Sequence, residues 1–418
     1  MGAPLALAPV LPSAGIVATA LAVGGVFCLP GQRPRALAAI AALVLAPAIL
    51  LGELWNNPQI ASLRDSPAAL AAALAGGILV VGALAFLFVH RPQLLPMLAF
   101  AALPFRIPVD AGGQTANLLV PLYGVVAGGV AAYAWTRLRG DQHGWVREPQ
   151  EPRKLEIAIV AYLALYALQA GYSTDFEQAV KNAAFFYVPF ALLLKLITTI
   201  EWSRKLALRC FAITVGLALC FVAIGFWEYQ TRELLWNQKV IASNQFESYF
   251  RVNSLFFDPN IYGRYLALTM VALAAVLLWQ RRPRSIALTA LILAVLWAGL
   301  VLTFSQSSFA ALLVGLLVIA CVRWRPGPIL AAVGAAAVAA LVVVVAAPGV
   351  IGLNTSAKNP LDKATSGRFE LLRGGLDMFI DRPLTGYGSG SFAEEYRERE
   401  HASSTRAASA SHTIPVTI

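Results

Sequence analysis

The chain has 418 residues, of which 58% are hydrophobic and only 13% are charged, and its formal net charge is +10. A soluble domain of ordinary composition carries about 25% charged residues. Long apolar runs alternate with short charged connectors along most of this chain, and this pattern excludes a water-soluble globular enzyme, a coiled coil and a disordered tail protein. It also excludes a transmembrane β-barrel, whose strands are about 10 residues long and alternate in polarity.

The positive net charge does not indicate a nucleic-acid-binding protein. Many of the basic residues stand in short connectors beside apolar runs, where they set membrane topology rather than form one patch. The four cysteines lie inside apolar runs and have no metal-ligand spacing, so we interpret them as small packing residues. We therefore expect neither a nucleic-acid partner nor a metal site.

The apolar runs predict an all-α polytopic membrane protein with about 12 transmembrane helices, because about 20 apolar residues cross a bilayer core of about 30 Å. The predicted spans lie near residues 11–29, 36–52, 67–90, 94–104, 117–135, 155–171, 181–200, 206–226, 261–279, 285–303, 307–322 and 328–347. The fourth run is short and contains or adjoins Pro92, Pro96 and Pro104. It is either a span or a broken, re-entrant helix, and in the second case the orientation of all preceding segments reverses.

Basic residues in the connectors predict the orientation of the chain. With twelve spans, one side of the membrane receives most of the basic residues of the short connectors, from Arg33 to Arg325. The positive-inside rule assigns this side to the cytoplasm. Two long segments, 227–260 and 348–412, then lie on the external face, where we expect the chemistry to take place.

These assignments divide the chain into four predicted parts. They are N-terminal transmembrane helices over 1–205, a transmembrane core over 206–347 that includes the external segment 227–260, a large external loop over 348–412, and the start of an incomplete further span over 413–418.

The large external loop contains one predicted amphipathic helix. Apolar residues from Phe369 to Phe379 recur at helical spacing, which predicts a helix over 367–380. Arg368 stands in the first turn of this helix, where a positive charge interacts unfavourably with the helix dipole. Two interpretations stay open: Arg368 binds a ligand or a partner, or its side chain is simply solvated by water. The Gly-x-Gly-x-Gly string of 386–390 predicts a turn rather than a dinucleotide loop, because no strand precedes it.

The first external segment contains an arginine without an evident local role. Asp258 followed by Pro259 is typical of a helix N-cap and its first residue. Arg251 precedes this cap and stands near three phenylalanines, and an arginine buried among aromatic rings needs an anionic partner. Glu247 and a phosphate group are the two candidates for that partner.

Several of these residues together form a recognisable order of motifs. They are Arg251 with Asp258-Pro259-Asn260, then Ser366-Gly367-Arg368, then Asp381-Arg382-Pro383-Leu384-Thr385-Gly386-Tyr387-Gly388, and finally His412 at the start of a further apolar segment. In this order, around the last four predicted spans, the motifs resemble those of the O-antigen ligase family. That family also includes polysaccharide polymerases and protein O-oligosaccharyltransferases. The resemblance covers residues 206–418.

The resemblance implies a GT-C-like fold and a membrane glycosyltransferase of the bacterial cytoplasmic membrane. Such an enzyme moves a glycan from an undecaprenyl-diphosphate carrier to an acceptor hydroxyl at the external face, without a metal, nucleotide or other cofactor. The resemblance implies that Arg251 and Arg368 bind the diphosphate, that Arg382 and Asn260 also bind the substrate, and that His412 activates the acceptor. The lipid bilayer, the lipid-linked donor and a lipid, protein or glycan acceptor are the expected partners.

Two departures from the family pattern keep other functions open. Gln306 follows Thr303-Phe304-Ser305, where the family usually has an arginine, and the chain ends six residues after His412, where the family continues into further spans. We therefore expect a C-terminally truncated protein. The alternatives are a polytopic transporter or flippase of a lipid-linked glycan, an inactive truncated membrane protein and a non-catalytic membrane scaffold.

Overall fold

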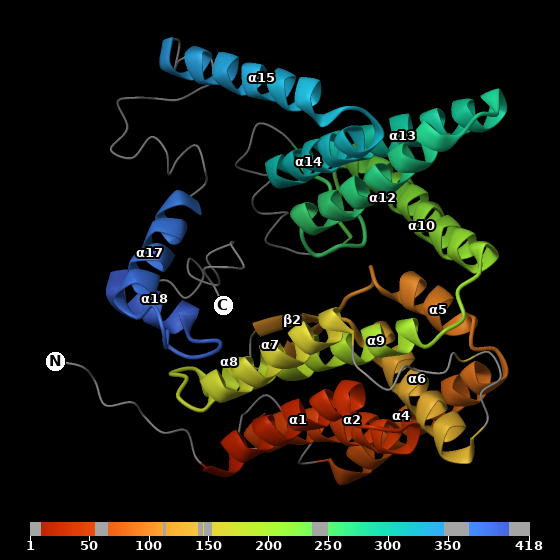
Figure 1. Cartoon of the computed structure of the whole chain (residues 1–418), viewed down its shortest axis with the longest axis vertical. Helices are drawn as coiled ribbons and strands as arrows, with labels where there is room; N and C mark the ends of the chain where they lie inside the picture. Colours follow the sequence, from red (N-terminus) through yellow and green to blue (C-terminus); the bar gives the residue numbers. More distant parts are fainter. Residues whose placement is uncertain are drawn as a thin grey trace.

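The computed structural model describes residues 10–54, 66–111, 114–140, 145, 153–235, 250–346 and 368–400, and nearly all of its regular structure is helical (Figure 1). The helices of the first half are α1 (Val10–Cys28), α2 (Gln32–Leu54), α4 (Pro67–His90), α5 (Leu94–Ala102), α6 (Val120–Arg139), α7 (Lys154–Ala170), α8 (Phe176–Asn182), the π-helix η2 (Ala183–Tyr187) and α9 (Val188–Thr198). The helices of the second half are α10 (Arg204–Thr231), α12 (Pro259–Trp279), α13 (Pro283–Leu302), α14 (Gln306–Arg323), α15 (Pro326–Ala346), α17 (Arg368–Asp381) and α18 (Phe392–Glu400).

The described residues contain seven helical segments that are long and apolar enough to cross a membrane. They are Gln32–Gly52, Pro67–His90, Phe176–Thr198, Arg204–Thr231, Pro259–Trp279, Pro283–Leu302 and Gln306–Arg323. This finding supports the predicted polytopic helical membrane protein. The count of about 12 spans, the orientation and the GT-C-like arrangement stay predictions.

The fourth predicted span does not form a full transmembrane helix. Residues 94–104 yield only α5, which has 9 residues and therefore rises about 14 Å, roughly half of the bilayer core. This corresponds to the broken-helix alternative. A short antiparallel hairpin follows, with β1 (Ile107–Ala111) paired to β2 (Gln114–Leu118). This hairpin was not predicted from the sequence, but the predicted all-α class of the fold is confirmed.

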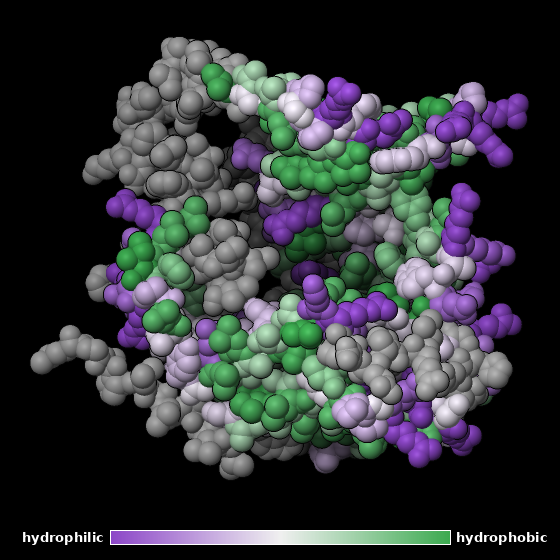
Figure 2. All heavy atoms as spheres, in the orientation of Figure 1, coloured by the Kyte–Doolittle hydropathy of each residue, from purple (hydrophilic) through white to green (hydrophobic). Residues whose placement is uncertain are grey.

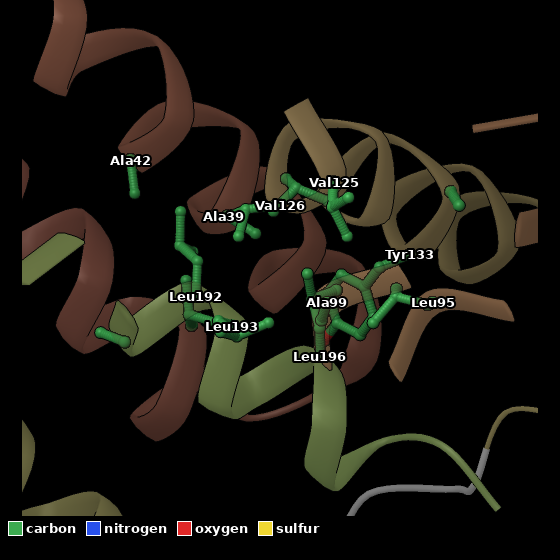
Figure 3. Close-up of a cluster of buried hydrophobic side chains, with 14 of the residues drawn as sticks. Ala39, Ala42, Leu95, Ala99, Val125, Val126, Tyr133, Leu192, Leu193 and Leu196 are labelled. Carbon is green, nitrogen blue, oxygen red and sulfur yellow. The ribbon is translucent and has the colours of Figure 1, made fainter. Parts of the chain in front are cut away.

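The buried apolar side chains of the described residues form two large cores. The first lies between α1, α2, α4, α5, α6 and α9, and Figure 3 shows how side chains from α2, α5, α6 and α9 meet there. Small residues allow this close packing, because a Cβ atom at Gly128 would lie 2.5 Å from the Cβ of Leu84. The second core lies between α10, α12, α13 and α14.

The outer surface of the helices is largely apolar. Ile78 and Leu79 of α4 are each 72% exposed, which a lipid-facing helix explains and a water-facing one does not. Figure 2 shows hydrophobic side chains over the helices of the first core and over those of the second core. It also shows a hollow between these two sets of helices, bordered by hydrophilic side chains. The boundaries predicted at 205/206 and 347/348 stay predictions, and most of 348–412 and all of 413–418 lie outside the described residues.

The amphipathic helix predicted over 367–380 is present as α17, and it packs on α18 through Met378, Phe392 and Tyr396. The glycine string after it forms a turn, as predicted. Gly386, Gly388 and Gly390 have φ angles of +63°, +97° and +85°, a backbone conformation that favours glycine. We call residues 382–391, which join α17 to α18, the glycine corner.

The glycine corner contacts the turn between α7 and α8. Ser173 Oγ donates a hydrogen bond to the Ser389 carbonyl at 2.7 Å, and Ser389 Oγ donates to the Tyr166 carbonyl at 2.9 Å. The hydroxyl of Tyr172 donates to the Thr385 carbonyl. These bonds fix the C-terminal helices on the N-terminal half of the chain.

Candidate functional site

The site begins at the first turn of α12. Asp258 accepts a hydrogen bond from the backbone N–H of Asn260 at 2.6 Å, and Pro259 occupies the first helical position, so the predicted N-cap is confirmed. This cap satisfies a free backbone donor of the helix and fixes the direction in which the Asn260 side chain leaves α12.

Arg251 and Asn260 lie side by side. The Nε of Arg251 donates to the carbonyl oxygen of Thr303 at 3.0 Å, and its Nη2 donates to Asn260 Oδ1 at 3.4 Å. The guanidinium is half-buried. Both of these acceptors are neutral groups, and together they fix the orientation of the guanidinium. Glu247, the acidic partner considered from the sequence, lies outside the described residues.

A group of hydroxyls surrounds the Asn260 side chain. Ser305 Oγ donates to Asn260 Oδ1 at 2.9 Å, and it lies 2.8 Å from Ser308 Oγ and 3.3 Å from Ser307 Oγ. Ser305 and Ser308 are fully buried. The connection between α13 and α14 thus places these serine hydroxyls at the ends of two helices that are long and apolar enough to cross a membrane. Gln306 is exposed at the first position of α14.

The backbone of this site adopts unusual conformations. Ser254 has φ +51° and Phe304 has φ +50°, and non-glycine residues seldom occupy this left-handed region. Such conformations cost roughly 1–3 kcal/mol each and persist where the surrounding contacts impose them. Both residues flank the Arg251–Thr303 contact.

Glu228 is the residue that the sequence did not reveal. It lies near the end of α10 and is fully buried, and its carboxyl group accepts hydrogen bonds from the backbone N–H groups of Ser254 at 2.7 Å, Asn253 at 3.2 Å and Leu235 at 3.3 Å. It thus holds the segment that carries Arg251. The only signal in the sequence is an acidic residue directly after an apolar run.

Two further arginines lie near this end of the helices. Arg264 is four residues beyond Asn260 on α12, so the two residues share a helix face, and its side chain is exposed. Arg106 is half-buried just before β1. Burial lowers the pKa of Arg106, the nearby Tyr123 opposes this shift, and the charge of Arg264 lowers the pKa further.

Arg382 lies in a different part of the described structure, at the glycine corner. Its guanidinium carbon is 4.4 Å from the centre of the Tyr387 ring. The carboxylate of Asp381 accepts hydrogen bonds from the Tyr387 hydroxyl and from Arg399, and these two bonds lower the pKa of Asp381. No contact between Arg382 and Arg251 is described.

Two predicted site residues lie at the edge of the described residues or beyond it. Arg368 is the first residue of α17, but its side chain is not among those described. His412 lies outside the described residues. The structure therefore brings Arg251 and Asn260 together, and the roles of Arg368, Arg382 and His412 stay predictions.

We expect the Tyr387→Phe variant to raise the pKa of Asp381 toward the usual carboxyl value of about 3.9, because one hydrogen bond to the charged form is lost. A carboxylate with a lowered pKa stabilises the corner at neutral pH and loses this effect as the pH falls through that pKa. The carboxyl carbon chemical shift of Asp381, followed by pH titration, measures the change. A Tyr229→Phe control should leave it unaltered, and an unaltered titration in Tyr387→Phe would contradict the assigned bond.

The fold and this site define a polytopic helical membrane protein with a polar, arginine-containing site at the ends of its membrane-spanning helices. Residues 291–418 match the family model described as O-Antigen ligase. This match supports the resemblance seen in the motifs that lie within residues 291–418, and it supports a function in cell-surface polysaccharide assembly. No curated protein and no solved structure gives a significant match to the chain.

Proposed function

We propose that this protein is a membrane glycosyltransferase that transfers a glycan from undecaprenyl diphosphate to an acceptor hydroxyl at the external face of the bacterial cytoplasmic membrane. The observation that carries the proposal is the fixed guanidinium of Arg251. Two neutral acceptors, the Thr303 carbonyl and the Asn260 side chain, hold it at the start of α12. A guanidinium oriented in this way can bind a phosphate oxygen with good geometry.

The reaction needs no external oxidant, reductant or metal. The acceptor oxygen attacks the anomeric carbon of the glycan, and the bond from that carbon to the diphosphate oxygen breaks. The electron pair leaves with undecaprenyl diphosphate, whose developing negative charge Arg251 stabilises. In the proposal His412 accepts the proton of the acceptor hydroxyl, a role that a neutral imidazole can fill.

We expect the Arg251→Lys variant to transfer glycan about 100-fold more slowly than the unaltered chain. The ammonium group of lysine is a point charge and cannot reproduce the two parallel hydrogen bonds of a planar guanidinium. The measurement is transfer of a lipid-linked glycan to an acceptor by the reconstituted full chain, with the product detected by mass spectrometry. Arg204→Lys is the matched control, since Arg204 is exposed at the start of α10. Equal rates in both variants would overturn the role of Arg251.

Arg368→Lys should also lose most of the transfer activity if Arg368 binds the diphosphate as proposed. The same reconstituted assay measures it, and full transfer by this variant would remove Arg368 from the site. Movement of lipid-linked glycan across the liposome membrane without a covalent product would contradict the glycosyltransferase and favour a transporter.

A further inference from the structure

Two fully buried hydroxyl groups lie in and beside the segment that follows Arg251. Ser254 and Tyr262 are each 0% exposed. Among the residues that the structure describes, neither Ser254 Oγ nor Tyr262 Oη has a hydrogen-bond partner. A buried hydroxyl without a partner is unfavourable, and most buried polar groups bond to protein atoms or to ordered water. These two hydroxyls therefore indicate a small polar ligand inside the protein.

The Tyr262 hydroxyl lies in the second core, where α10, α12 and α13 meet (Figure 1). An added Cβ atom at Gly225 of α10 would lie 3.2 Å from Tyr262 Oη, and one at Gly299 of α13 would lie 3.4 Å from it. Both neighbouring helices thus place a glycine next to this hydroxyl, rather than a side chain that could form a hydrogen bond with it.

The carboxyl group of Glu228 is close to the same place. Gly225 and Glu228 are three positions apart on α10, so they share a helix face. The side chain of Val252 lies 3.5 Å from the position of an added Cβ at Gly225, and the backbone N–H of Ser254 donates to the Glu228 carboxyl group at 2.7 Å. Residues 252–254 therefore pass both positions, and they bring the Ser254 hydroxyl close to the carboxyl group.

The carboxyl group of Glu228 can accept one more hydrogen bond. A carboxylate has about four acceptor sites on its two oxygens. The backbone N–H groups of Asn253 and Ser254 donate to Oε2, and that of Leu235 donates to Oε1. In the described part of the chain no side chain donates to Glu228, so Oε1 keeps one acceptor site for a further donor.

We propose that an internal water molecule binds here, donates a hydrogen bond to Glu228 and is held by the hydroxyls of Tyr262 and Ser254. A buried water typically makes about three hydrogen bonds, and these three groups supply them. The water then adds to the bonds by which Glu228 holds the segment that carries Arg251. Only its effect on glycan transfer rests on the proposed function.

The Tyr262→Phe variant tests this site, because the direction of its effect depends on the water. If the hydroxyl binds water, the substitution removes one hydrogen bond. Exchange at the amides of Asn253 and Ser254 should then accelerate about fivefold, which corresponds to one ordinary hydrogen bond. If the hydroxyl is buried without any partner, its removal is favourable, and exchange should stay unaltered or become slower. Hydrogen exchange of the full chain in lipid nanodiscs measures the difference.

Tyr265→Phe is the matched control. The Tyr265 hydroxyl donates to the Thr214 carbonyl at 3.1 Å between the same two helices, α12 and α10. Its removal should leave exchange at Asn253 and Ser254 unaltered. A density map of the full chain, at a resolution that shows ordered waters, provides the direct measurement. It should contain a water within about 3 Å of Tyr262 Oη, and this water should be lost in the map of Tyr262→Phe.

Unaltered or slower exchange in Tyr262→Phe would overturn the inference, and so would a map without a water at hydrogen-bond distance from Tyr262 Oη. Equal acceleration in Tyr265→Phe would also overturn it, because the effect would then not be specific to this site. None of these measurements requires glycan transfer. If the water is present and the unaltered chain transfers no glycan, the glycosyltransferase proposal fails and the water site remains.

Discussion

Replacement of Glu228 by alanine is expected to release the segment that carries Arg251 and to abolish most of the transfer activity. The substitution leaves the backbone N–H groups of Asn253 and Ser254 without their acceptor in a buried position. A buried donor without an acceptor costs about 1–3 kcal/mol, so we expect a local destabilisation of about 3 kcal/mol. Hydrogen exchange at these two amides should accelerate by roughly two orders of magnitude, which is the corresponding change in the opening equilibrium.

Two further variants separate this positioning role from a general effect of lost charge. Glu228→Gln keeps one carbonyl acceptor and should retain part of the protection and part of the activity. Glu233→Ala removes an exposed acidic residue of the same region and should change neither. Rapid exchange in Glu233→Ala, or unaltered exchange in Glu228→Ala, would contradict the assignment.

Gly388→Ala is expected to detach the glycine corner from the turn between α7 and α8. A Cβ atom at this position would lie 2.4 Å from the Cα of Ser173, and the residue has φ +97°. A shift of either backbone would strain the hydrogen bond from Ser173 to the Ser389 carbonyl. We expect a loss of more than about 3 kcal/mol of docking free energy, from backbone strain and overpacking together. Hydrogen exchange over residues 385–391 measures it.

Gly386→Ala provides the matched control for this experiment. Gly386 also has a positive φ, +63°, but no atom lies within 4 Å of the position of an added Cβ. The control therefore suffers only the strain of a left-handed alanine, about 1–2 kcal/mol. If both variants show the same exchange, the close contact with Ser173 does not hold the corner in place.

Much of the local structure could be predicted from the sequence because it depends on neighbouring residues. Apolar runs predicted the membrane helices, Asp258-Pro259 predicted the start of α12, and the spacing of apolar residues predicted α17. At residues 94–104 the structure corresponds to the broken-helix alternative, because a short run with prolines in and around it is too short to cross the membrane as one helix. The Gly-Gly pair at 112–113 is a local sequence signal for the hairpin that follows α5.

The candidate site was predicted only in part, because its contacts join distant positions. Arg251 and Asn260 could be chosen from motifs nine residues apart. Their contacts to Thr303 and Ser305 span 52 and 45 residues, and no local pattern indicates them. Glu228 was missed for the same reason, since its role depends on the backbone of a segment 25 and 26 residues later.

The dependence of the glycine corner on the turn between α7 and α8 has a consequence for protein engineering. The bonds between these segments join residues 213 to 223 positions apart, and the backbone at Gly388 and Gly390 leaves no room for a Cβ atom beside Ser173 and Ala179. A chimera that receives residues 368–400 from a homologous protein should therefore assemble properly only if residues 166–179 come from the same donor.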